Sequence, residues 1–363
     1  MKSKDEIQQE CLIELLKYDK AGAALSMGIG KTLLCLKHMN SNYTDHCRFL
    51  VVAPSISILN TWIDECIKHK MEHLIPHIER TTYISLNKRD LDFDIVYFDE
   101  AHSLKESHLE WLSNFKGKVV GVTGTPPSPR NSKRMDIMNR YYPIKYKYLV
   151  DQAISDSLLN DYEIVIHKLS LDTQKNIRVE KGKAVWFTSE KMDYDYWTNR
   201  VANATSQKDR QITSIMRMKS LQKFKSKEYL AKKLLYKMEN KTIVFANTQE
   251  QADSFGIPSY HSNNPDSEEN LADFRAGNID RLSCVLQLNE GVNIPELKES
   301  IILHSYGNEK KLSQRLGRTL RLNPNDKATI HVLVFRDTID EQWVMQALQD
   351  FDKNKVKTIN HDY

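Results

Sequence analysis

Short apolar runs alternate along the chain with stretches in which apolar residues recur every three or four positions. The stretches of helical period include residues 33–39 and 58–69. The apolar runs predict buried strands at residues 23–25, 49–53, 95–98, 119–122, 162–169, 242–246, 282–288, 300–304 and 328–335. Alternation of strand and helix is typical of parallel sheets with helices on both faces. The sequence therefore predicts an α/β fold.

The series of predicted strands is interrupted after Tyr141-Tyr142-Pro143. Residues 145–240 hold one strand candidate, at residues 162–169, followed by mostly charged material of helical character. A chain of 363 residues is also longer than one usual domain. We therefore predict two domains, residues 1–150 and 151–363, with a basic and mostly helical segment at about residues 170–235 as a small insertion.

The charges of the whole chain nearly balance, but one segment is strongly basic. Lys and Arg number 52 against 48 Asp and Glu, so the chain is not a polycation, but it has room for a basic patch. Residues 205–233 form such a patch, with nine Lys and Arg against two Asp and Glu. It is either a solvated helix face or a surface that contacts phosphates near a nucleic-acid track.

Several classes of protein are disfavoured by the sequence. No stretch approaches 18 consecutive apolar residues, so we expect no membrane span. The charged N-terminus lacks the apolar core of a signal peptide. The five cysteines are odd in number and form no CxxC pair, which disfavours a disulfide scaffold or a zinc ribbon. We expect a cytoplasmic protein that is not secreted.

A glycine-rich loop follows the first predicted strand and reads Met27-Gly28-Ile29-Gly30-Lys31-Thr32. Glycines let backbone N–H groups close around phosphate oxygens, and the N-terminus of the following helix favours an anion. In loops of this type Lys31 reaches the β- and γ-phosphates, and Thr32 ligates Mg²⁺. The strict pattern fails at its first glycine, where this chain has Leu25.

Two adjacent carboxylates, Asp99 and Glu100, end the predicted strand at residues 95–98. Ligands of open α/β sheets bind at the carboxyl ends of strands. We expect Asp99 to hold Mg²⁺, directly or through water, and Glu100 to orient and deprotonate an attacking water. Thr123 and Thr125 follow the next apolar strand, where hydroxyls can sense the state of a bound phosphate.

The order of these motifs resembles that of the superfamily 2 helicases and translocases. Residues 27–32 resemble motif I, and Thr123-Gly124-Thr125-Pro126 resembles motif III. Asp99-Glu100-Ala101-His102 resembles motif II in its Asp-Glu-Ala-His form. In the second half, the segments similar to motifs IV, V and VI are residues 242–247, 288–295 and 314–321. The resemblance implies two tandem RecA-like domains with an ATP cleft between them, and ATP and Mg²⁺ as cofactors.

The resemblance also implies which residues form the site. The implied catalytic residues are Lys31, Asp99, Glu100, Gln314, Arg318 and Arg321. Those implied to bind ATP are Gln8, Met27, Gly28, Ile29, Gly30, Lys31, Thr32 and Gly291, of which Gln8 matches the family's adenine-reading glutamine. Those implied to bind nucleic acid are Pro54, Ser55, Thr82, Tyr83, Thr123, Thr125, Asn247 and Asn289. Asn293 stands where the family usually has an aspartate.

Helical spacing supports the role of the motif VI arginines. At 100° per residue, Gln314, Arg318 and Arg321 lie within about 60° of one another, and three leucines form a stripe on the opposite side. An arginine aimed at a γ-phosphate stabilises the charge of the transition state, which is worth roughly 10³–10⁵ in rate. The two domains would then share one ATP, held by Lys31 and Asp99 from the first and completed by the arginines of the second.

Two further clusters have alternative explanations. His69, His73 and His77 recur every four residues, but they lack an HExxH pattern and Pro76 interrupts the helix, which favours a role other than metal binding. Four aromatic residues in the inserted segment are either packing residues or a stack for bases. They are Trp186, Tyr194, Tyr196 and Trp197.

The sequence thus predicts a monomeric, ATP-driven motor that acts on duplex or branched DNA. It is either a helicase that separates strands or a double-strand translocase that remodels forks, branched DNA or bound proteins. Thr61-Trp62 and Thr338-Ile339-Asp340-Glu341 resemble segments of Swi/Snf-type translocases and favour the second. The alternatives are an RNA helicase and a nucleic-acid-binding protein that uses ATP as a switch. The Lys- and Asn-rich composition favours a viral or phage source, and hence the host cytoplasm.

Overall fold

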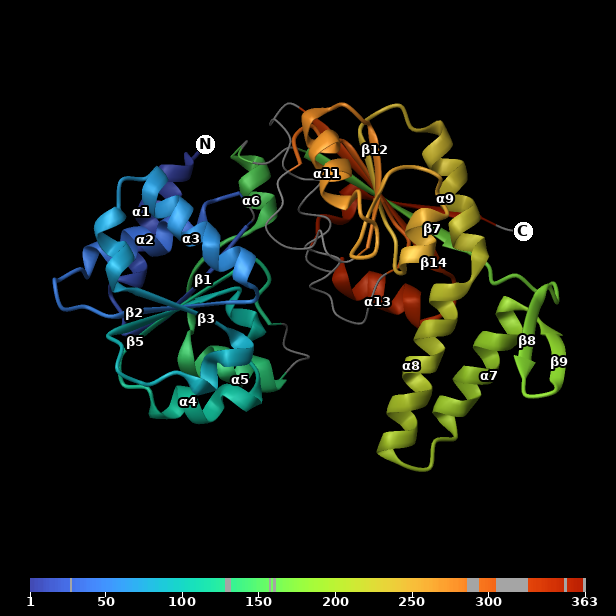
Figure 1. The fold of residues 1–363 in the computed structure, drawn as a ribbon, viewed down its shortest axis with the longest axis horizontal. Helices are drawn as coiled ribbons and strands as arrows, with labels where there is room; N and C mark the ends of the chain where they lie inside the picture. Colours follow the sequence, from blue (N-terminus) through green and yellow to red (C-terminus); the bar gives the residue numbers. More distant parts are fainter. Residues whose placement is uncertain are drawn as a thin grey trace. The chain divides into compact units, whose positions relative to one another are not determined.

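The computed structural model describes residues 1–26, 28–127, 132–156, 158, 161–285, 294–304, 326–348 and 351–361. The chain divides into two compact units, Met1–Leu159 and Asn160–Tyr363 (Figure 1). Each unit is built on a parallel β-sheet with packed helices, so the predicted α/β class is confirmed. Among the described helices, none has the length and apolar character needed to cross a membrane.

The first unit contains a parallel sheet of six strands in its described residues, in the order β3-β2-β4-β5-β1-β6. The strands are β1 (Lys20–Leu25), β2 (Phe49–Ala53), β3 (Ile78–Thr82), β4 (Ile95–Asp99), β5 (Lys118–Thr123) and β6 (Ile144–Tyr148). The helices are α1 (Lys4–Leu15), α2 (Lys31–Ser41), α3 (Ile56–Lys68), α4 (Leu109–Asn114), α5 (Ser132–Tyr141) and α6 (Val150–Ser155). Short 3₁₀ turns are η1 (Glu72–His77), η2 (Tyr83–Lys88), η3 (Ala101–Ser103) and η4 (Glu106–His108).

The central strands of this sheet are apolar on both faces because helices cover both. Figure 1 shows α1, α2 and α3 on one side of the sheet and α4 and α5 on the other. Val51 and Tyr97 pack in one hydrophobic cluster, while their neighbours Val52 and Phe98 pack in the other. Unbroken apolar runs are the signature of such doubly covered parallel strands. Because the strands are parallel, the loops that follow β1, β2, β4 and β5 all lie at the same edge of the sheet.

The second unit contains a parallel sheet whose described strands have the order β11-β12-β10-β13-β14-β7-β15. They are β7 (Asp161–Leu169), β10 (Thr242–Phe245), β11 (Ser259–Tyr260), β12 (Arg281–Cys284), β13 (Glu299–Ile302), β14 (Lys327–Phe335) and β15 (Val356–His361). The helices around it are α9 (Lys225–Lys237), α10 (Gln249–Asp253), α11 (Ser267–Ala276) and α13 (Ile339–Ala347), with a 3₁₀ turn η6 (Lys353–Lys355). Strand β7 enters the sheet beside β14, so the segment after the first unit becomes part of the second core.

Residues 170–223, which we call the arm, lie between β7 and α9. The arm consists of an antiparallel hairpin, β8 (Ile177–Lys181) and β9 (Ala184–Thr188), and of two helices, α7 (Glu190–Ala202) and α8 (Gln207–Lys223). In Figure 1 both helices project away from the second sheet. The basic segment predicted at about residues 170–235 is indeed mostly helical, but the prediction missed its hairpin.

The base of the arm is fixed to the second unit by buried polar contacts. The carboxylate of Glu190 accepts hydrogen bonds from the backbone N–H groups of Asp172 and Ser226, both at 3.1 Å. The hydroxyl of Tyr194 accepts one from the backbone N–H of Ile339 at 2.9 Å, at the start of α13. Because Glu190 and Tyr194 are buried, these bonds are shielded from water and hold the arm in one orientation relative to α9 and α13.

The segment Thr338-Ile339-Asp340-Glu341 has a structural explanation. Thr338 caps α13, its hydroxyl accepting a hydrogen bond from the backbone N–H of Asp340 at 3.3 Å. The carboxylate of Asp340 pairs with Lys227, a fully buried lysine of α9. The ammonium of Lys227 also donates to the carbonyl of Leu303 at 3.0 Å. Removing one partner of such a pair would leave an uncompensated buried charge, so the segment ties α13 to α9.

Three histidines on neighbouring strands form a chain of hydrogen bonds. Nδ1 of His167 on β7 lies 2.9 Å from Nε2 of His361 on β15, and its Nε2 lies 2.9 Å from Nδ1 of His331 on β14. Burial and the two neighbouring imidazoles lower the pKa of His167 to about 3, and burial lowers that of His331 to about 4. Burial disfavours a charged imidazolium at these positions, so the hydrogen-bonded histidines are stable when neutral.

Because these three histidines are hydrogen-bonded in their neutral form, we predict that acid destabilises the second unit. The unfolded chain, with histidine pKa values near 6.5, binds more protons than the folded chain between about pH 3 and 6.5, so stability falls as the pH decreases. For His167 the loss between pH 7 and 5 is about 2 kcal/mol. Thermal unfolding followed by circular dichroism is expected to show a shallower pH dependence for His167→Leu than for the wild type. The exposed His46, replaced by Gln, is the control; equal slopes in all three proteins would contradict the assignment.

Candidate functional site

The loop after β1 has a conformation that requires its glycines. Gly28 and Gly30 have φ angles of 81° and 83°, in the left-handed region that favours glycine. A Cβ atom on Gly30 would lie 2.6 Å from Nε2 of Gln8, which is too close. Lys31 and Thr32 then begin α2, so the loop leads into a helix N-terminus as predicted. Met27 lies outside the described residues.

The side chain of Gln8, on α1, forms a hydrogen bond with this loop. Its side chain is buried, and its Nε2 donates a hydrogen bond to the carbonyl of Ile29 at 2.6 Å. Its Oε1 accepts one from Nζ of Lys37 at 2.8 Å. In this structure the amide of Gln8 therefore holds the loop in place, a role that its resemblance to an adenine-reading glutamine did not predict.

Asp99 and Glu100 lie at the end of β4, opposite Lys31. Nζ of Lys31 is 3.5 Å from Oε1 of Glu100. Burial and the charge of Glu100 raise the pKa of Asp99 to about 6. Burial also raises the pKa of Glu100, but Lys31 and His102 outweigh this effect, and the net shift is downward. Glu100 has a φ angle of 51°, a strained conformation that re-aims its side chain after the strand.

His102 connects the carboxylates with the threonines after β5. Its Nδ1 lies 3.3 Å from Oε2 of Glu100, 2.7 Å from the hydroxyl of Thr123 and 3.2 Å from the hydroxyl of Thr125. The hydroxyl of Thr123 also accepts a hydrogen bond from the backbone N–H of Thr125 at 3.1 Å. The segments predicted as motifs I, II and III thus meet in one network, Lys31–Glu100–His102–Thr123.

Two residues predicted to bind nucleic acid are buried instead. Thr123 has no exposed surface, and its hydroxyl faces His102. Tyr83 is 7% exposed, and its hydroxyl donates to the carbonyl of Asp99 at 2.7 Å. A direct contact of either side chain with nucleic acid does not fit this burial. Both residues lie close to the carboxylates because β3, β4 and β5 end at the same edge of the sheet.

Trp62 is a residue of the site whose role the sequence did not predict. It lies on α3 with no exposed surface, and its indole Nε1 donates to Oδ2 of Asp99 at 3.2 Å. Together with Tyr83, it holds Asp99 through both its carboxylate and its backbone carbonyl. The resemblance marked Trp62 only as part of a translocase-like segment, because nothing in the sequence shows that α3 packs over the end of β4.

The other predicted nucleic-acid residues are partly exposed. Pro54 and Ser55 follow β2, and Ser55 caps α3 through the backbone N–H of Ile58 at 3.4 Å. Thr82 ends β3 at the same edge of the first sheet. In the second unit, Asn247 follows β10, and its Oδ1 is buried without a hydrogen-bond partner among the residues that the structure describes. Asn289, Gly291, Gln314, Arg318 and Arg321 lie outside the described residues.

Comparisons with known proteins find similarity to helicases and to a translocase. Residues 225–323 match the family model described as the helicase conserved C-terminal domain. The chain is 25% identical to a protein named DNA 3'-5' translocase XPB2 from Sulfurisphaera tokodaii, in an alignment that covers 90% of this chain and 81% of that protein. These matches support a superfamily 2 helicase or translocase. They also support the use of ATP.

Solved structures of helicases and related enzymes share the fold. The ATP-dependent Type ISP restriction-modification enzyme LlaBIII bound to DNA has a TM-score of 0.64 at 16% identity, covering 99% of this chain but 31% of that enzyme. S. cerevisiae Dbp5 bound to RNA and ADP BeF3 has a TM-score of 0.57 at 13% identity, covering 98% and 89%. The Pyrococcus furiosus Hef helicase domain has a TM-score of 0.51 at 14% identity, covering 94% and 97%. The predicted pair of RecA-like domains is thereby confirmed.

His69, His73 and His77 each contact a different polar group. His69 pairs with Glu65 at 3.2 Å, within α3 and the residue after it. Nε2 of His73 lies 2.9 Å from Oδ1 of Asn40, and Nδ1 of His77 lies 2.9 Å from the carbonyl of Cys47. His73 and His77 thus connect η1 to α2 and to the segment before β2, whereas the contact of His69 is local to the end of α3.

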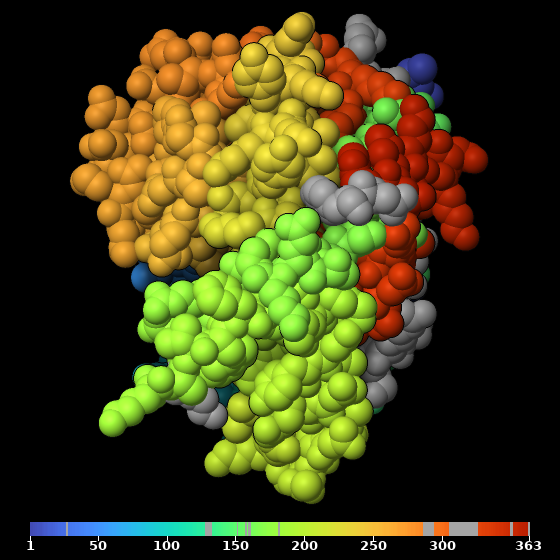
Figure 2. Space-filling view, turned by 90° about the vertical axis from the view of Figure 1, so that its right-hand side faces the viewer, coloured from blue at the N-terminus to red at the C-terminus, as the bar shows by residue number. Residues whose placement is uncertain are grey.

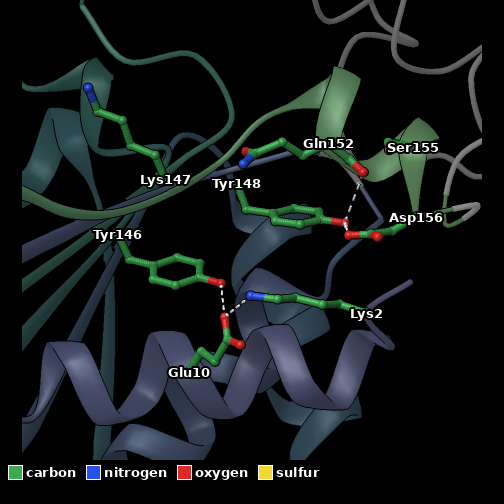
Figure 3. Close-up of a pocket in the computed structure, with 8 residues that line it drawn as sticks. All are labelled: Lys2, Glu10, Tyr146, Lys147, Tyr148, Gln152, Ser155 and Asp156. Carbon is green, nitrogen blue, oxygen red and sulfur yellow. Dashed lines mark hydrogen bonds and ion pairs between the residues drawn. The ribbon is translucent and has the colours of Figure 1, made fainter.

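A surface pocket of about 500 Å³ lies beside α1, β6 and α6 (Figure 3). Glu10 accepts hydrogen bonds there from Lys2 at 2.7 Å and from the hydroxyl of Tyr146 at 2.9 Å. The hydroxyl of Tyr148 donates to Asp156 at 2.8 Å. Glu10 and Gln8 point to different sides of α1, since two helical residues are about 200° apart. The pocket's polar groups tie α1 to β6 and α6 and do not belong to the phosphate loop.

Proposed function

We propose that the chain is an ATP-driven motor that translocates on double-stranded DNA and remodels forks, branched DNA or bound proteins. The observation that carries the proposal is the network Lys31–Glu100–His102–Thr123, which links the phosphate loop to the loops after β4 and β5. Support for DNA comes from the relative named a DNA translocase. RNA is the alternative, because one structure with the same fold is bound to RNA.

The chemistry follows from the residues around the loop. The backbone N–H groups of residues 28–32 lie at the N-terminus of α2 and bind the phosphates. Lys31 neutralises the charge that develops at the γ-phosphate. Glu100 is kept ionised by Lys31 and His102, so it accepts a proton from the attacking water. Arg318 and Arg321 of the second half would complete the site by stabilising the transition state.

Asp99 and Thr32 fit the requirements of Mg²⁺, which prefers hard oxygen ligands. The raised pKa of Asp99 indicates that the charge of this buried carboxylate is incompletely compensated, and a cation beside it would supply the compensation. When bound, Mg²⁺ would neutralise charge on the β- and γ-phosphates. Asp99 itself is held for this purpose by Trp62 and Tyr83.

Trp62→Phe is therefore expected to weaken metal binding. The substitution keeps an aromatic ring in the buried site but removes the N–H group that orients the Asp99 carboxylate. Hydrogen bonds to charged groups contribute about 1.5–3 kcal/mol, so we expect a rise of roughly 10- to 100-fold in the Mn²⁺ dissociation constant, measured by electron paramagnetic resonance with nucleotide present. Trp111→Phe is the matched control, since its indole donates to the carbonyl of Arg89 at 3.1 Å. Equal Mn²⁺ affinity in the two variants would reject the positioning role.

His102 offers a route by which phosphate release reaches the rest of the first unit. It contacts Glu100 on one side and Thr123 and Thr125 on the other. A change in the charge around Glu100 therefore alters the hydrogen bonds of the loop after β5. This is the local event that a motor needs in order to turn hydrolysis into a conformational change.

Strand displacement and triplex displacement assays, run side by side, test the proposed mode of action. A double-strand translocase removes the third strand of a triplex with ATP while leaving a plain duplex intact. A helicase separates the duplex instead. Displacement of the triplex strand by the wild type, and its absence in Glu100→Gln, would support the proposal; duplex unwinding without triplex displacement, or activity on RNA alone, would reject it.

A further inference from the structure

The positive charge of the chain is concentrated in the arm. Residues 170–223 contain 11 Lys and Arg against 6 Asp and Glu, whereas the whole chain has an excess of only four positive charges. The rest of the chain is therefore close to neutral. Within the arm, residues 175–188, which form and flank the hairpin, hold four basic residues against one acidic residue. Such a local excess favours an anionic partner.

The same hairpin exposes large apolar side chains. Val185, Trp186 and Phe187 are consecutive residues of β9, and 52%, 44% and 55% of their surfaces are exposed. Because successive strand residues point to opposite faces, Trp186 and Phe187 lie on different faces of the hairpin. The pairing of β8 with β9 places Arg178 directly opposite Phe187. Single exposed apolar residues are common, but this hairpin exposes large apolar side chains on both of its faces.

The aromatic residues of α7 divide into two groups. Tyr194 is buried and holds the base of the arm through Ile339, so it is a packing residue. Tyr196, two positions later, is 53% exposed on a different side of the helix. Of these aromatic residues, Tyr194 is therefore a packing residue, whereas Trp186 and Tyr196 are exposed. Figure 2 shows one face of the arm, in green and yellow-green, on the surface of the second unit.

Exposed aromatic rings among basic residues are the combination that binds an unpaired nucleic-acid strand. Bases of a single strand stack on aromatic side chains while Lys and Arg contact the phosphates. A duplex offers no free base faces to Trp186 and Phe187. Protein interfaces are depleted of Lys, whereas three of the four basic residues at positions 175–188 are lysines, which disfavours a protein partner.

We propose that the β8–β9 hairpin binds an unpaired strand, with bases stacked on Trp186 and Phe187 and phosphates contacted by the basic residues of the arm. The proposal rests on the proposed function as a nucleic-acid motor, and it adds that the substrate contains a single-stranded part, as a fork or a branched junction does. The bonds of Glu190 and Tyr194 at the base of the arm would carry force from this strand to α9 and α13.

Fluorescence anisotropy with a labelled oligo(dT) strand and a labelled blunt duplex, without nucleotide, tests the proposal. In the double variant Trp186→Ala, Phe187→Ala we expect about tenfold weaker binding of the single strand and duplex affinity within twofold of the wild type, because stacking contributes to single-strand binding alone. Tyr236→Ala, which removes an aromatic side chain that is 85% exposed on α9, is the matched control. Unchanged single-strand affinity in the double variant would overturn the proposal and leave a protein partner as the alternative.

A second variant covers the case in which the double variant does not fold. Lys208 and Lys219 are exposed on one face of α8, so Lys208→Glu, Lys219→Glu changes charge without changing the hairpin. We expect it to weaken oligo(dT) binding several-fold and to flatten its dependence on salt. Unchanged salt dependence would overturn the proposal. If the arm binds the single strand but no nucleic acid stimulates ATP hydrolysis, the motor function is rejected and this inference is retained.

Discussion

Glu100→Gln is expected to lower the rate of ATP hydrolysis by about 10²–10⁴-fold while leaving ATP binding intact. Glutamine has nearly the shape of glutamate but accepts no proton, so the attacking water is no longer activated. The substitution also removes the negative charge that pairs with Lys31 and lies beside His102. Steady-state phosphate release gives the rate, and a fluorescent ATP analogue gives the affinity.

Glu106→Gln is the matched control for this experiment. Glu106 lies in the same unit, is exposed, and pairs with Lys133 at 2.9 Å, outside the network of the site. An exposed pair of this kind contributes little to stability, so we expect a rate within twofold of the wild type. Wild-type hydrolysis by Glu100→Gln would show that Glu100 is not the general base.

Arg318→Ala and Arg321→Ala are expected to lower the hydrolysis rate by roughly 10³–10⁵-fold, with a much smaller change in ATP affinity. Both arginines would stabilise charge that is present only in the transition state, so their loss affects the rate more than binding. Single-turnover hydrolysis and equilibrium binding, measured on the same variants, separate the two effects. This prediction depends on the helical spacing of residues 314–321 and on their resemblance to motif VI.

Arg275→Ala provides the control for the arginines. Arg275 is an exposed arginine in the last turn of α11, in the second unit but outside the predicted motifs. We expect it to hydrolyse ATP at the wild-type rate. If the motif VI variants did the same, the two halves of the chain would not share one ATP.

Much of the fold could be predicted because its central strands are apolar on both faces. The runs at residues 49–53 and 95–98 correspond to β2 and β4, which are buried throughout. Strands β3 and β6 were missed because they lie at the edges of the first sheet, where polar residues interrupt the pattern. Strand β15, which is largely exposed at the edge of the second sheet, was missed for the same reason.

The loop and the two carboxylates could be predicted because their chemistry is local in sequence. Gly28 and Gly30 need glycine for their backbone conformation, and Asp99 with Glu100 directly follows a buried strand. Trp62 could not be predicted, because its bond to Asp99 joins residues 37 positions apart and depends on how α3 packs. The burial of Thr123 was missed because a motif shows which residues occur, and not which way their side chains point.

The arm shows the same distinction between pattern and packing. Its basic charge and helical character are visible in the sequence, and its aromatic residues were identified as either packing or stacking residues. The choice between the two depends on exposure, which places Tyr194 in the core and Trp186 on the surface. The hairpin itself gives a weak signal, since three of the five residues of β8 are charged.

The rate of ATP hydrolysis with and without nucleic acid tests the central claim most directly. It should be measured for the full chain against single-stranded, duplex and branched DNA and the corresponding RNAs, with Glu100→Gln as the inactive reference. We predict slow hydrolysis by the protein alone and strong stimulation by duplex and branched DNA. Hydrolysis that no nucleic acid stimulates, or that RNA alone stimulates, would contradict a DNA motor built on these two units.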